Sequence, residues 1–518
     1  MDRRDFLRTT VAGAVAAVPS QSLLAARQNG VCQPPQGISS ARPQEPVRFI
    51  FRQRPLGTSW PLRSDDVNAV YGSYVGAVQG EEQIAWKAVQ YQDPDAKPAG
   101  AYWLAWNGDG TVSWSVSSPK SMECDLNLCY ASASSGAPAV VSLAGQRLER
   151  TLGQTKGYWP DELNNPMNFE RVPLAGKLRL SEGENIIRLR ISGSRGTVRV
   201  RSLELVPLEA KENLRKDAER ARASRASTDW FVGAGYGLFI HWTSQVQPLK
   251  GEQKPYAEAV GEFNVPEFAS LVEETGAGYL ILTANHADPT FPAPIKSWEH
   301  YHPGWTTQRD LIGEIADELA KRDIRLIVYM AADIVGGVHS RLVSTQEYQT
   351  TLESTWTEIG NRYGERVAGY WFDHGSWSKE NYPNLSYRSM WKAVKAGNPH
   401  RLVAYNFWQF PVMTEWQDYW ANEAALQRPP ESRYMTVGPA KGLQYHAAVP
   451  IDGAWLHLTP NSAMENPIWS DEQVVDFVRG CIAHQGVVSL AAAISQDLHM
   501  SDSTLHQLRL VRRAIRGK

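Results

Sequence analysis

The stretch Val367-Ala-Gly-Tyr-Trp-Phe-Asp373-His-Gly is an apolar run that ends abruptly in a carboxylate, and a glycine follows closely. Such a run predicts a buried strand. An ionised aspartate buried inside a strand without partners would be very costly, so we expect Asp373 at the last position of the strand, facing a pocket. The C-terminal ends of parallel strands are where (β/α) barrels keep their catalytic groups. Helix N-capping is the alternative, but the next helical pattern begins only at Leu385, so capping explains this position less well.

Apolar runs alternate with amphipathic helical stretches through the last part of the chain, residues 229–518. Candidate strands lie at 237–242, 279–285, 325–330, 367–373, 401–406, 419–423, 454–458 and 487–493. The clearest helices are expected at 266–275, 310–322, 345–363 and 471–484, with a last one at 508–516. Alternating strands and helices of this number predict a (β/α)8 TIM-type barrel.

Residues 47–208 have a different texture, with short runs of period-two alternation separated by Gly-rich turns. Clear runs lie at 101–106, 111–116, 123–130, 139–143, 185–191 and 197–205. This pattern predicts an antiparallel β-sandwich. Its order of strands resembles the jelly-roll carbohydrate-binding modules attached to many glycosidases, although a sandwich that only packs on the next domain fits the pattern equally well. The charged, Ala-rich stretch 209–228 predicts a linker helix between the two domains.

The N-terminal segment carries paired arginines, Arg3 and Arg4, followed by Phe6-Leu7 and the mild apolar run 11–18. This is the pattern of a twin-arginine signal peptide, which we place at 1–30, with cleavage near Ala25-Ala26. Residues 31–46 are rich in Pro, Gln and Ser and are expected to form a tether. The sequence therefore predicts export through the twin-arginine route to the periplasm or the cell exterior.

Composition narrows the range of partners. A formal net charge of −2 argues against nucleic acid or an anionic membrane as the main partner, and no stretch resembles a transmembrane helix. The 19 Trp and 20 Tyr lend mild support to a glycan ligand, because aromatic faces suit sugar rings. The four cysteines match no zinc pattern, and Cys124 and Cys129 should point to opposite faces of one strand. No metal or organic cofactor is implied.

Most of the predicted barrel strands end on a polar, chemically capable side chain. These are His241, Asn285 with His286, Asp333, Asp373, Asn406, Glu423 and His457. A single histidine or aspartate is usually structural, but a series of them at successive strand ends predicts an active site at one rim of a barrel.

Several ordered motifs resemble the retaining α-L-fucosidase family. They are Trp230-Phe with Gly235-Tyr-Gly-Leu-Phe-Ile-His-Trp242, Gly276-Ala-Gly-Tyr-Leu-Ile-Leu-Thr-Ala-Asn-His286-Ala-Asp288, Arg309-Asp-Leu-Ile-Gly-Glu-Ile-Ala and Gly369-Tyr-Trp-Phe-Asp373. The resemblance implies that Asp373 is the nucleophile and that His241 and His286 hold sugar hydroxyls. It further implies substrate contacts for Trp242, Asn285, Trp371 and Asn406.

A retaining glycosidase needs a second carboxyl, which acts first as an acid and then as a base. Asp418-Tyr-Trp-Ala-Asn-Glu423 resembles the Gly-Asp-Phe-x-x-Pro-Glu stretch of the family, which favours Glu423 as this group. Glu415 is the second choice and Asp418 the third. The indoles that we expect to form an apolar wall against the sugar are those of Trp371, Trp377, Trp408 and Trp420.

The chain also departs from the family pattern. Asn285 stands where the family usually has the first of two adjacent histidines, and Thr243 replaces a glycine. We expect no counterpart of the family's C-terminal β-sandwich after the helix predicted at 508–516. These changes leave three readings open: an α-L-fucosidase, a related enzyme for another α-linked sugar such as an α-galactoside, and a degenerate barrel that binds glycans without cleaving them. A plain scaffold without a ligand is the least favoured.

Overall fold

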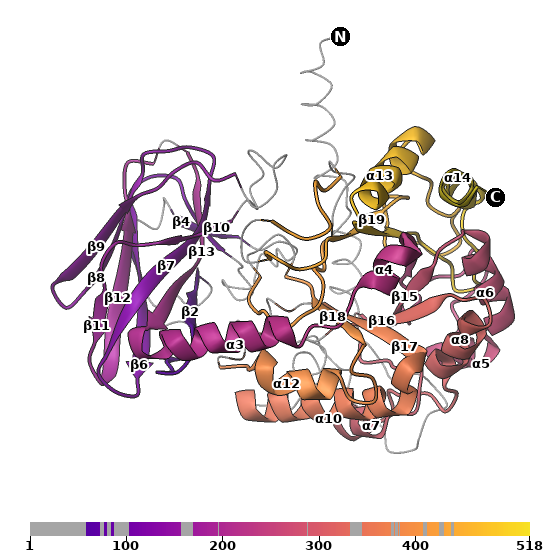
Figure 1. Cartoon of the computed structure of the whole chain (residues 1–518), viewed down its shortest axis with the longest axis horizontal. Coiled ribbons are helices and arrows are strands. Elements are labelled where there is room, and N and C mark those ends of the chain that lie inside the picture. Colours follow the sequence, from indigo (N-terminus) through magenta and orange to yellow (C-terminus); the bar gives the residue numbers. More distant parts are fainter. Residues whose placement is uncertain are drawn as a thin grey trace, which may run out of the picture.

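The computed structural model shows a mixed α/β protein with β-rich and α/β parts (Figure 1). It describes residues 59–72, 77–79, 84–87, 103–156, 169–194, 196–286, 288–331, 344–373, 375, 378, 382, 384–407, 412–423, 429–436 and 440–517. The predicted signal peptide and tether lie outside these residues, as do Cys32, Asp333, Trp377 and Trp408. The predicted domain boundaries stay predictions.

Two β-sheets make up the described N-terminal part. The first has the strand order β1-β6-β12-β8-β9, with β3 also paired to β6, and the second has the order β10-β7-β13-β5-β4, with β11 on β7 and β2 on β13. The strands of the first sheet are β1 Trp60–Pro61, β3 Ala77–Gln79, β6 Gly110–Ser118, β8 Pro138–Leu143, β9 Gln146–Thr151 and β12 Gly183–Ile191. Those of the second are β2 Asn68–Tyr71, β4 Ile84–Lys87, β5 Trp103–Trp106, β7 Met122–Ser132, β10 Glu170–Pro173, β11 Leu178–Leu180 and β13 Val198–Pro207.

Period-two alternation explains why these strands form. Along β6 every second side chain is buried, and Val112, Trp114 and Val116 join one hydrophobic core with Leu126 of β7 and Leu203 of β13. Because β6 and β7 belong to different sheets, the two sheets share this core. Apart from the parallel pair β1–β6, the strand pairs are antiparallel.

A single helix leads from the β-rich part to the α/β part. Helix α3 (Lys211–Ala223) follows the short turn η3 (Leu208–Ala210), as the charged sequence predicts. Figure 1 shows α3 running from beneath the N-terminal sheets towards the α/β part.

The α/β part is built on a parallel sheet with the order β18-β17-β16-β15-β14-β20-β19. Its strands are β14 Tyr236–Ile240, β15 Tyr279–Asn285, β16 Arg325–Ala331, β17 Val367–Asp373, β18 Leu402–Tyr405, β19 His446–Pro450 and β20 Val487–Ala491. The described helices are α4 Asp229–Ala234, α5 Tyr256–Glu262, α6 Val265–Glu274, α7 Lys296–Tyr301, α8 Leu311–Ala320, α10 Thr345–Tyr363, α12 Tyr387–Val394, α13 Asp471–Ala483 and α14 Asp502–Arg516, with the turn η4 Gly364–Arg366. The helices predicted around 266–275, 310–322, 345–363 and 471–484 are therefore confirmed.

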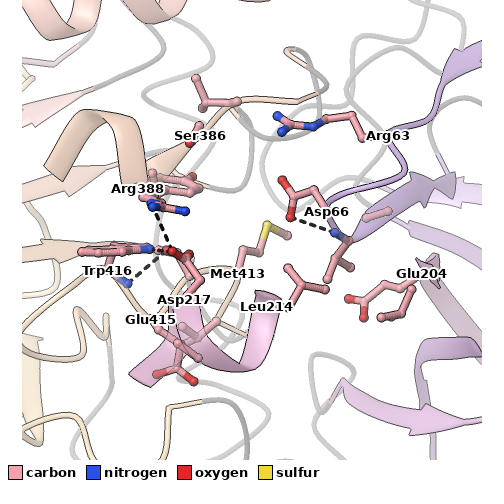
Figure 2. A pocket seen from close by; sticks show the side chains of 18 of the residues that line it. Arg63, Asp66, Glu204, Leu214, Asp217, Ser386, Arg388, Met413, Glu415 and Trp416 are labelled. Atoms are coloured by element: carbon pink, nitrogen blue, oxygen red, sulfur yellow. Dashed lines mark hydrogen bonds and ion pairs between the residues drawn. The ribbon is translucent and has the colours of Figure 1, made fainter. Parts of the chain in front are cut away.

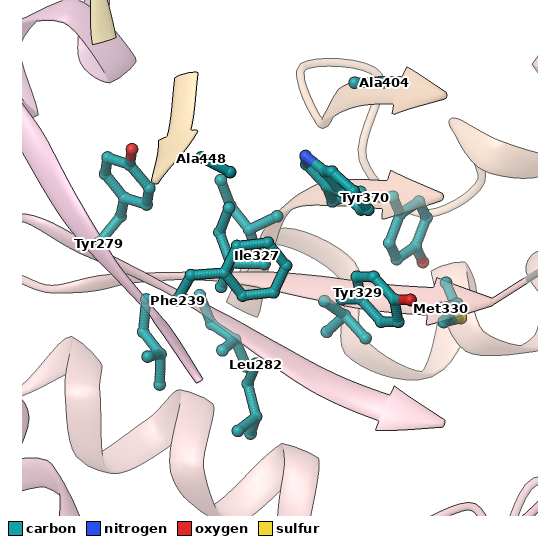
Figure 3. Packing of buried hydrophobic residues seen from close by; sticks show 14 of the residues in the cluster. Phe239, Tyr279, Leu282, Ile327, Tyr329, Met330, Tyr370, Ala404 and Ala448 are labelled. Atoms are coloured by element: carbon teal, nitrogen blue, oxygen red, sulfur yellow. The ribbon is translucent and has the colours of Figure 1, made fainter. Parts of the chain in front are cut away.

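Ring contacts show that this sheet is strongly curled. The ring of Phe239 on β14 lies 5.5 Å from that of Trp371 on β17, although β15 and β16 separate the two strands. In a flat sheet three strand spacings would hold them roughly 14 Å apart. Figure 3 shows Phe239, Ile327 and Tyr329 gathered inside this curve.

The strand predicted at 454–458 is wrong, because that segment is a loop and the strand lies at β19 instead. Strands of a parallel sheet are buried on both faces and read as continuous apolar runs. His446-Ala-Ala-Val fits that description, whereas Trp455 and His457 show an alternation that belongs here to a loop following Gly453, which has a positive φ of 74°.

The segment predicted as the sixth strand is present as two isolated bridges, Tyr419↔Gln444 and Glu423↔Ala448. The backbone N–H of Asp418 also donates to Val403 O on β18, at 2.7 Å. Since β18 and β19 are the two edges of the curled sheet, segment 418–423 hydrogen-bonds to both edges.

Candidate active site

Asp373 is the last residue of β17, as the sequence predicts, and it is 4% exposed. Its carboxylate accepts two hydrogen bonds from neighbouring strands. The hydroxyl of Tyr329, on β16, donates to Oδ2 at 2.5 Å, and the amide of Asn406, directly after β18, donates to Oδ1 at 2.9 Å. These bonds solvate the buried charge and fix the direction in which the carboxylate points.

Asn406 also connects Asp373 to the second predicted carboxyl. Its Nδ2 donates to Glu423 Oε1 at 2.6 Å. The two acceptor oxygens, on Asp373 and Glu423, are therefore at most 5.5 Å apart, the sum of the two hydrogen-bond lengths. Glu423 is partly exposed, whereas Asp373 is buried. One amide thus holds two carboxyls side by side at the C-terminal ends of the strands.

Two histidines lie beside this pair. The ring of His241, directly after β14, lies 4.9 Å from the ring of Tyr329 and 5.4 Å from that of His286. Thr283 Oγ1 is hydrogen-bonded to His241 Nδ1 at 2.6 Å. Burial lowers the pKa of His241 to about 3, so its imidazole is neutral at physiological pH. A neutral imidazole held at one nitrogen is suited to a hydrogen bond with an uncharged hydroxyl.

Aromatic rings line the same region. Trp371 is fully buried and stacks on Tyr329 with ring centroids 5.2 Å apart. Trp455 comes from the loop after β19 and lies 5.4 Å from the ring of His241. Sequence reasoning missed Tyr329, which stands inside a strand rather than at its end. It also missed Trp455, because it placed that residue in a strand. Trp420 is 9% exposed and packs edge-on against Tyr445 at 6.4 Å.

Two of the predicted substrate contacts are engaged elsewhere. Asn285 is fully buried, and its amide bonds the backbone of Ala331 at both ends, accepting at 3.1 Å and donating at 3.5 Å. The indole of Trp242 packs against Phe263, and its N–H donates to Gln496 O at 3.2 Å. Their predicted roles in binding stay predictions.

The other candidates for the acid/base have structural partners. Glu415 accepts from Arg222 and Arg225, each at 3.0 Å. Asp418 is fully buried and lies 2.7 Å from the ammonium of Lys395. These ion pairs leave Glu423 as the candidate carboxyl that shares a hydrogen-bond donor with Asp373.

A further buried carboxyl stands in the loop after β19. Asp452 accepts from Ala493 N at 2.8 Å, and burial raises its pKa to about 7, with a smaller contribution from Glu465. His457, predicted as a strand-end residue, lies in the same loop and pairs with Glu465 at 3.1 Å. Among the described residues, no group of three or more His, Cys, Asp or Glu side chains could hold a metal ion.

A comparison with known proteins matches this part of the chain. Residues 256–487 match the family model described as alpha-L-fucosidase. This part of the chain, less than half of its length, therefore resembles the α-L-fucosidase family. The family match spans α5 to the start of β20 and includes Asp373, Asn406 and Glu423.

Curated α-L-fucosidases are similar in sequence to this chain over only part of their length. The tissue α-L-fucosidase of Macaca fascicularis is 29% identical over 138 residues, which cover 20% of this chain and 29% of that protein. That of Bos taurus is 28% identical over 138 residues, with the same coverage. The chain thus spans less than a third of the length of these relatives. The unliganded α-L-fucosidase of Lactobacillus casei aligns at 15% identity and a TM-score of 0.42, covering 57% of this chain and 98% of that structure.

Proposed function

We propose that this protein is a retaining glycoside hydrolase that removes α-L-fucosyl residues from glycans. The observation that carries the proposal is the Asp373–Asn406–Glu423 arrangement. Retaining glycosidases hold their two carboxyl groups about 5–5.5 Å apart, whereas inverting enzymes need roughly 6.5–9.5 Å to fit a water molecule between them. The upper limit of 5.5 Å on the two acceptor oxygens here supports the retaining arrangement.

In the proposed reaction Asp373 attacks the anomeric carbon and Glu423 protonates the departing oxygen. The bond from the anomeric carbon to the leaving group breaks as the bond to Asp373 forms. Glu423, now a carboxylate, then takes a proton from water, which attacks the same carbon and releases Asp373. The burial of Asp373 and the partial exposure of Glu423 suit these roles, because the acid must exchange protons with solvent and the nucleophile must not.

The neighbouring groups would position the sugar. His241 and His286 offer hydrogen bonds to hydroxyls, and the partly exposed Trp455 offers apolar surface to the ring. Tyr329 would hold Asp373 in its attacking orientation. The engagement of Asn285 with Ala331 favours one alternative, an α-linked sugar other than L-fucose, since that amide is not free to read a hydroxyl.

We also infer that the curled parallel sheet closes into a (β/α)8 barrel and that the two N-terminal sheets form a β-sandwich. Segment 418–423, bonded to both β18 and β19, supports the first inference, and the shared core of the two sheets supports the second. Export through the twin-arginine route remains a proposal that rests on Arg3 and Arg4.

A panel of aryl glycosides tests the proposal. We expect hydrolysis of the α-L-fucoside, with release of the α-anomer observed first by NMR and a 2-fluoro-fucosyl label on the peptide that contains Asp373. Preferred cleavage of the α-galactoside would establish the alternative sugar. Binding of fucose without cleavage of any member of the panel would establish the degenerate, glycan-binding barrel and refute the hydrolase.

A further inference from the structure

The segment that carries Glu423 passes through the junction between the N-terminal sheets, helix α3 and the curled sheet. Residues 412–418 of this segment form neither helix nor strand. Their conformation must therefore come from contacts with other parts of the chain. A cavity of about 490 Å³ lies at this junction, lined by residues of the N-terminal sheets, of α3, of 385–388 at the start of α12 and of the segment itself (Figure 2).

Helix α3 holds the segment at two consecutive residues. Asp217 accepts from Trp416 Nε1 at 3.0 Å and pairs with Arg388 of α12 at 3.2 Å, and Figure 2 shows both partners directed at its carboxylate. Towards the end of the helix and just beyond it, Arg222 and Arg225 both pair with Glu415. Arg225 is the more sheltered of the two, at 13% side-chain exposure against 53% for Arg222, so it is the stronger contact.

The chain that follows α3 also contacts the segment, through Ala226. Ala226 N donates to Asp418 Oδ1 at 2.7 Å, while the other oxygen of Asp418 accepts from Val403 N of β18 at 2.8 Å. The fully buried carboxylate of Asp418 therefore ties the end of the linker to β18, the strand that leads into Asn406. The N-terminal part adds a contact of its own, because the hydroxyl of Tyr71 donates to Met413 Sδ at 3.6 Å.

We propose that helix α3 is a positioning element of the active site, which holds residues 413–418 so that Glu423 meets its substrate at the correct angle. The inference rests on the proposed function and deepens it. It assigns Asp217 of α3 and Arg225, two residues beyond the end of α3, as positioning residues, since they act on the reaction through the segment and not by touching the sugar.

The test is carried out in the full-length protein with the variants Asp217→Ala and Arg225→Met. A matched control is Arg215→Ala, on the same helix, because Arg215 pairs with Glu212 and Glu219 of α3 itself. Each variant is assayed on aryl α-L-fucosides with good and with poor leaving groups. Only poor leaving groups need a well-placed acid.

We expect kcat/KM for the poor leaving groups to fall roughly 10- to 100-fold, the loss typical of a displacement near 1 Å. For the good leaving groups we expect a change of less than about threefold, and for the control no change with either class. The same substitutions in a Glu423→Ala background should have almost no further effect, because residues that act through one another are not additive.

Three outcomes separate the inference from the function that it builds on. Equal losses for both classes of leaving group would show a merely structural role for α3 and overturn the inference. Full additivity with Glu423→Ala would overturn it as well. If Glu423→Ala itself shows no dependence on the leaving group, the proposed acid is wrong, and the positioning of Glu423 fails with it.

Discussion

The substitution Asp373→Asn separates chemistry from folding at the proposed nucleophile. The new side chain has nearly the same shape, and its amide oxygen can keep the hydrogen bond from Asn406 or the one from Tyr329. The tyrosine hydroxyl can rotate and accept from the new NH2 group. What is lost is the charge assistance of two hydrogen bonds, about 1–2 kcal/mol, and the removal of a buried charge offsets part of that. We therefore expect the melting temperature to change by only a few degrees.

Turnover should respond quite differently. Without a carboxylate no covalent glycosyl intermediate forms, and the rate should fall by at least about three orders of magnitude, or roughly 4 kcal/mol in the activation barrier. Hydrolysis of an aryl α-L-fucoside and thermal unfolding are measured on the same preparation. Asp452→Asn is a matched control, because it makes the same change at a buried aspartate in the loop after β19. Turnover close to wild type in Asp373→Asn, once mass spectrometry has excluded deamidation, would refute the assignment.

The other predictions concern the acid, stability and export. Glu423→Ala should keep hydrolysis of substrates with good leaving groups and gain rate with azide, measured as glycosyl azide formed; absence of azide rescue would count against this residue. Folding raises the pKa of the Asp452 carboxyl from 3.8 to about 7. The folded state therefore loses stability relative to the unfolded state as the pH rises from about 4 to 7, because the carboxyl can ionise only in the unfolded chain over that range. The free energy of unfolding of Asp452→Asn should therefore exceed that of the wild type increasingly across this range, by up to roughly 4 kcal/mol at its upper end. Urea titrations at several pH values measure this difference, and parallel pH profiles of the two proteins would contradict the prediction. A Cβ at Gly237 would lie 2.3 Å from the ring of Tyr279, so Gly237→Ala should cost about 1–3 kcal/mol or more in thermal unfolding, and an unchanged melting temperature would contradict that packing. Changing Arg3 and Arg4 to Lys should retain the precursor in the cytoplasm on fractionation, and unaltered secretion would contradict the twin-arginine assignment.

Asn406 has a structural role between the two carboxyls of this site. The sequence predicts Asn406 as a substrate contact, but its amide is hydrogen-bonded to both Asp373 and Glu423. Its place between two carboxyls indicates that it holds them together and lowers their mutual repulsion. Glu423 is the proposed acid/base because it shares the amide of Asn406 with Asp373. The other two candidates are engaged in ion pairs, Glu415 with Arg222 and Arg225 and Asp418 with Lys395.

The sequence by itself determined the local elements of this protein. The apolar run 367–373 gave the strand and put Asp373 at its end, and alternating or amphipathic patterns located most other strands and helices. The strand predicted at 454–458 was wrong, because periodicity indicates which side chains are buried and does not distinguish a partly buried loop from a strand.

Only the tertiary structure decided which groups meet. Asp373, Asn406 and Glu423 come from three segments, and their hydrogen bonds depend on the curvature and register of the sheet. Tyr329 reaches Asp373 from a neighbouring strand, and Trp455 reaches His241 from a loop. Arg222 of α3 binds Glu415, which lies 193 residues further along the chain. Such contacts leave no pattern in a short stretch of sequence, because each side chain obeys the burial rules of its own element and its partner is chosen by the packing of the whole fold.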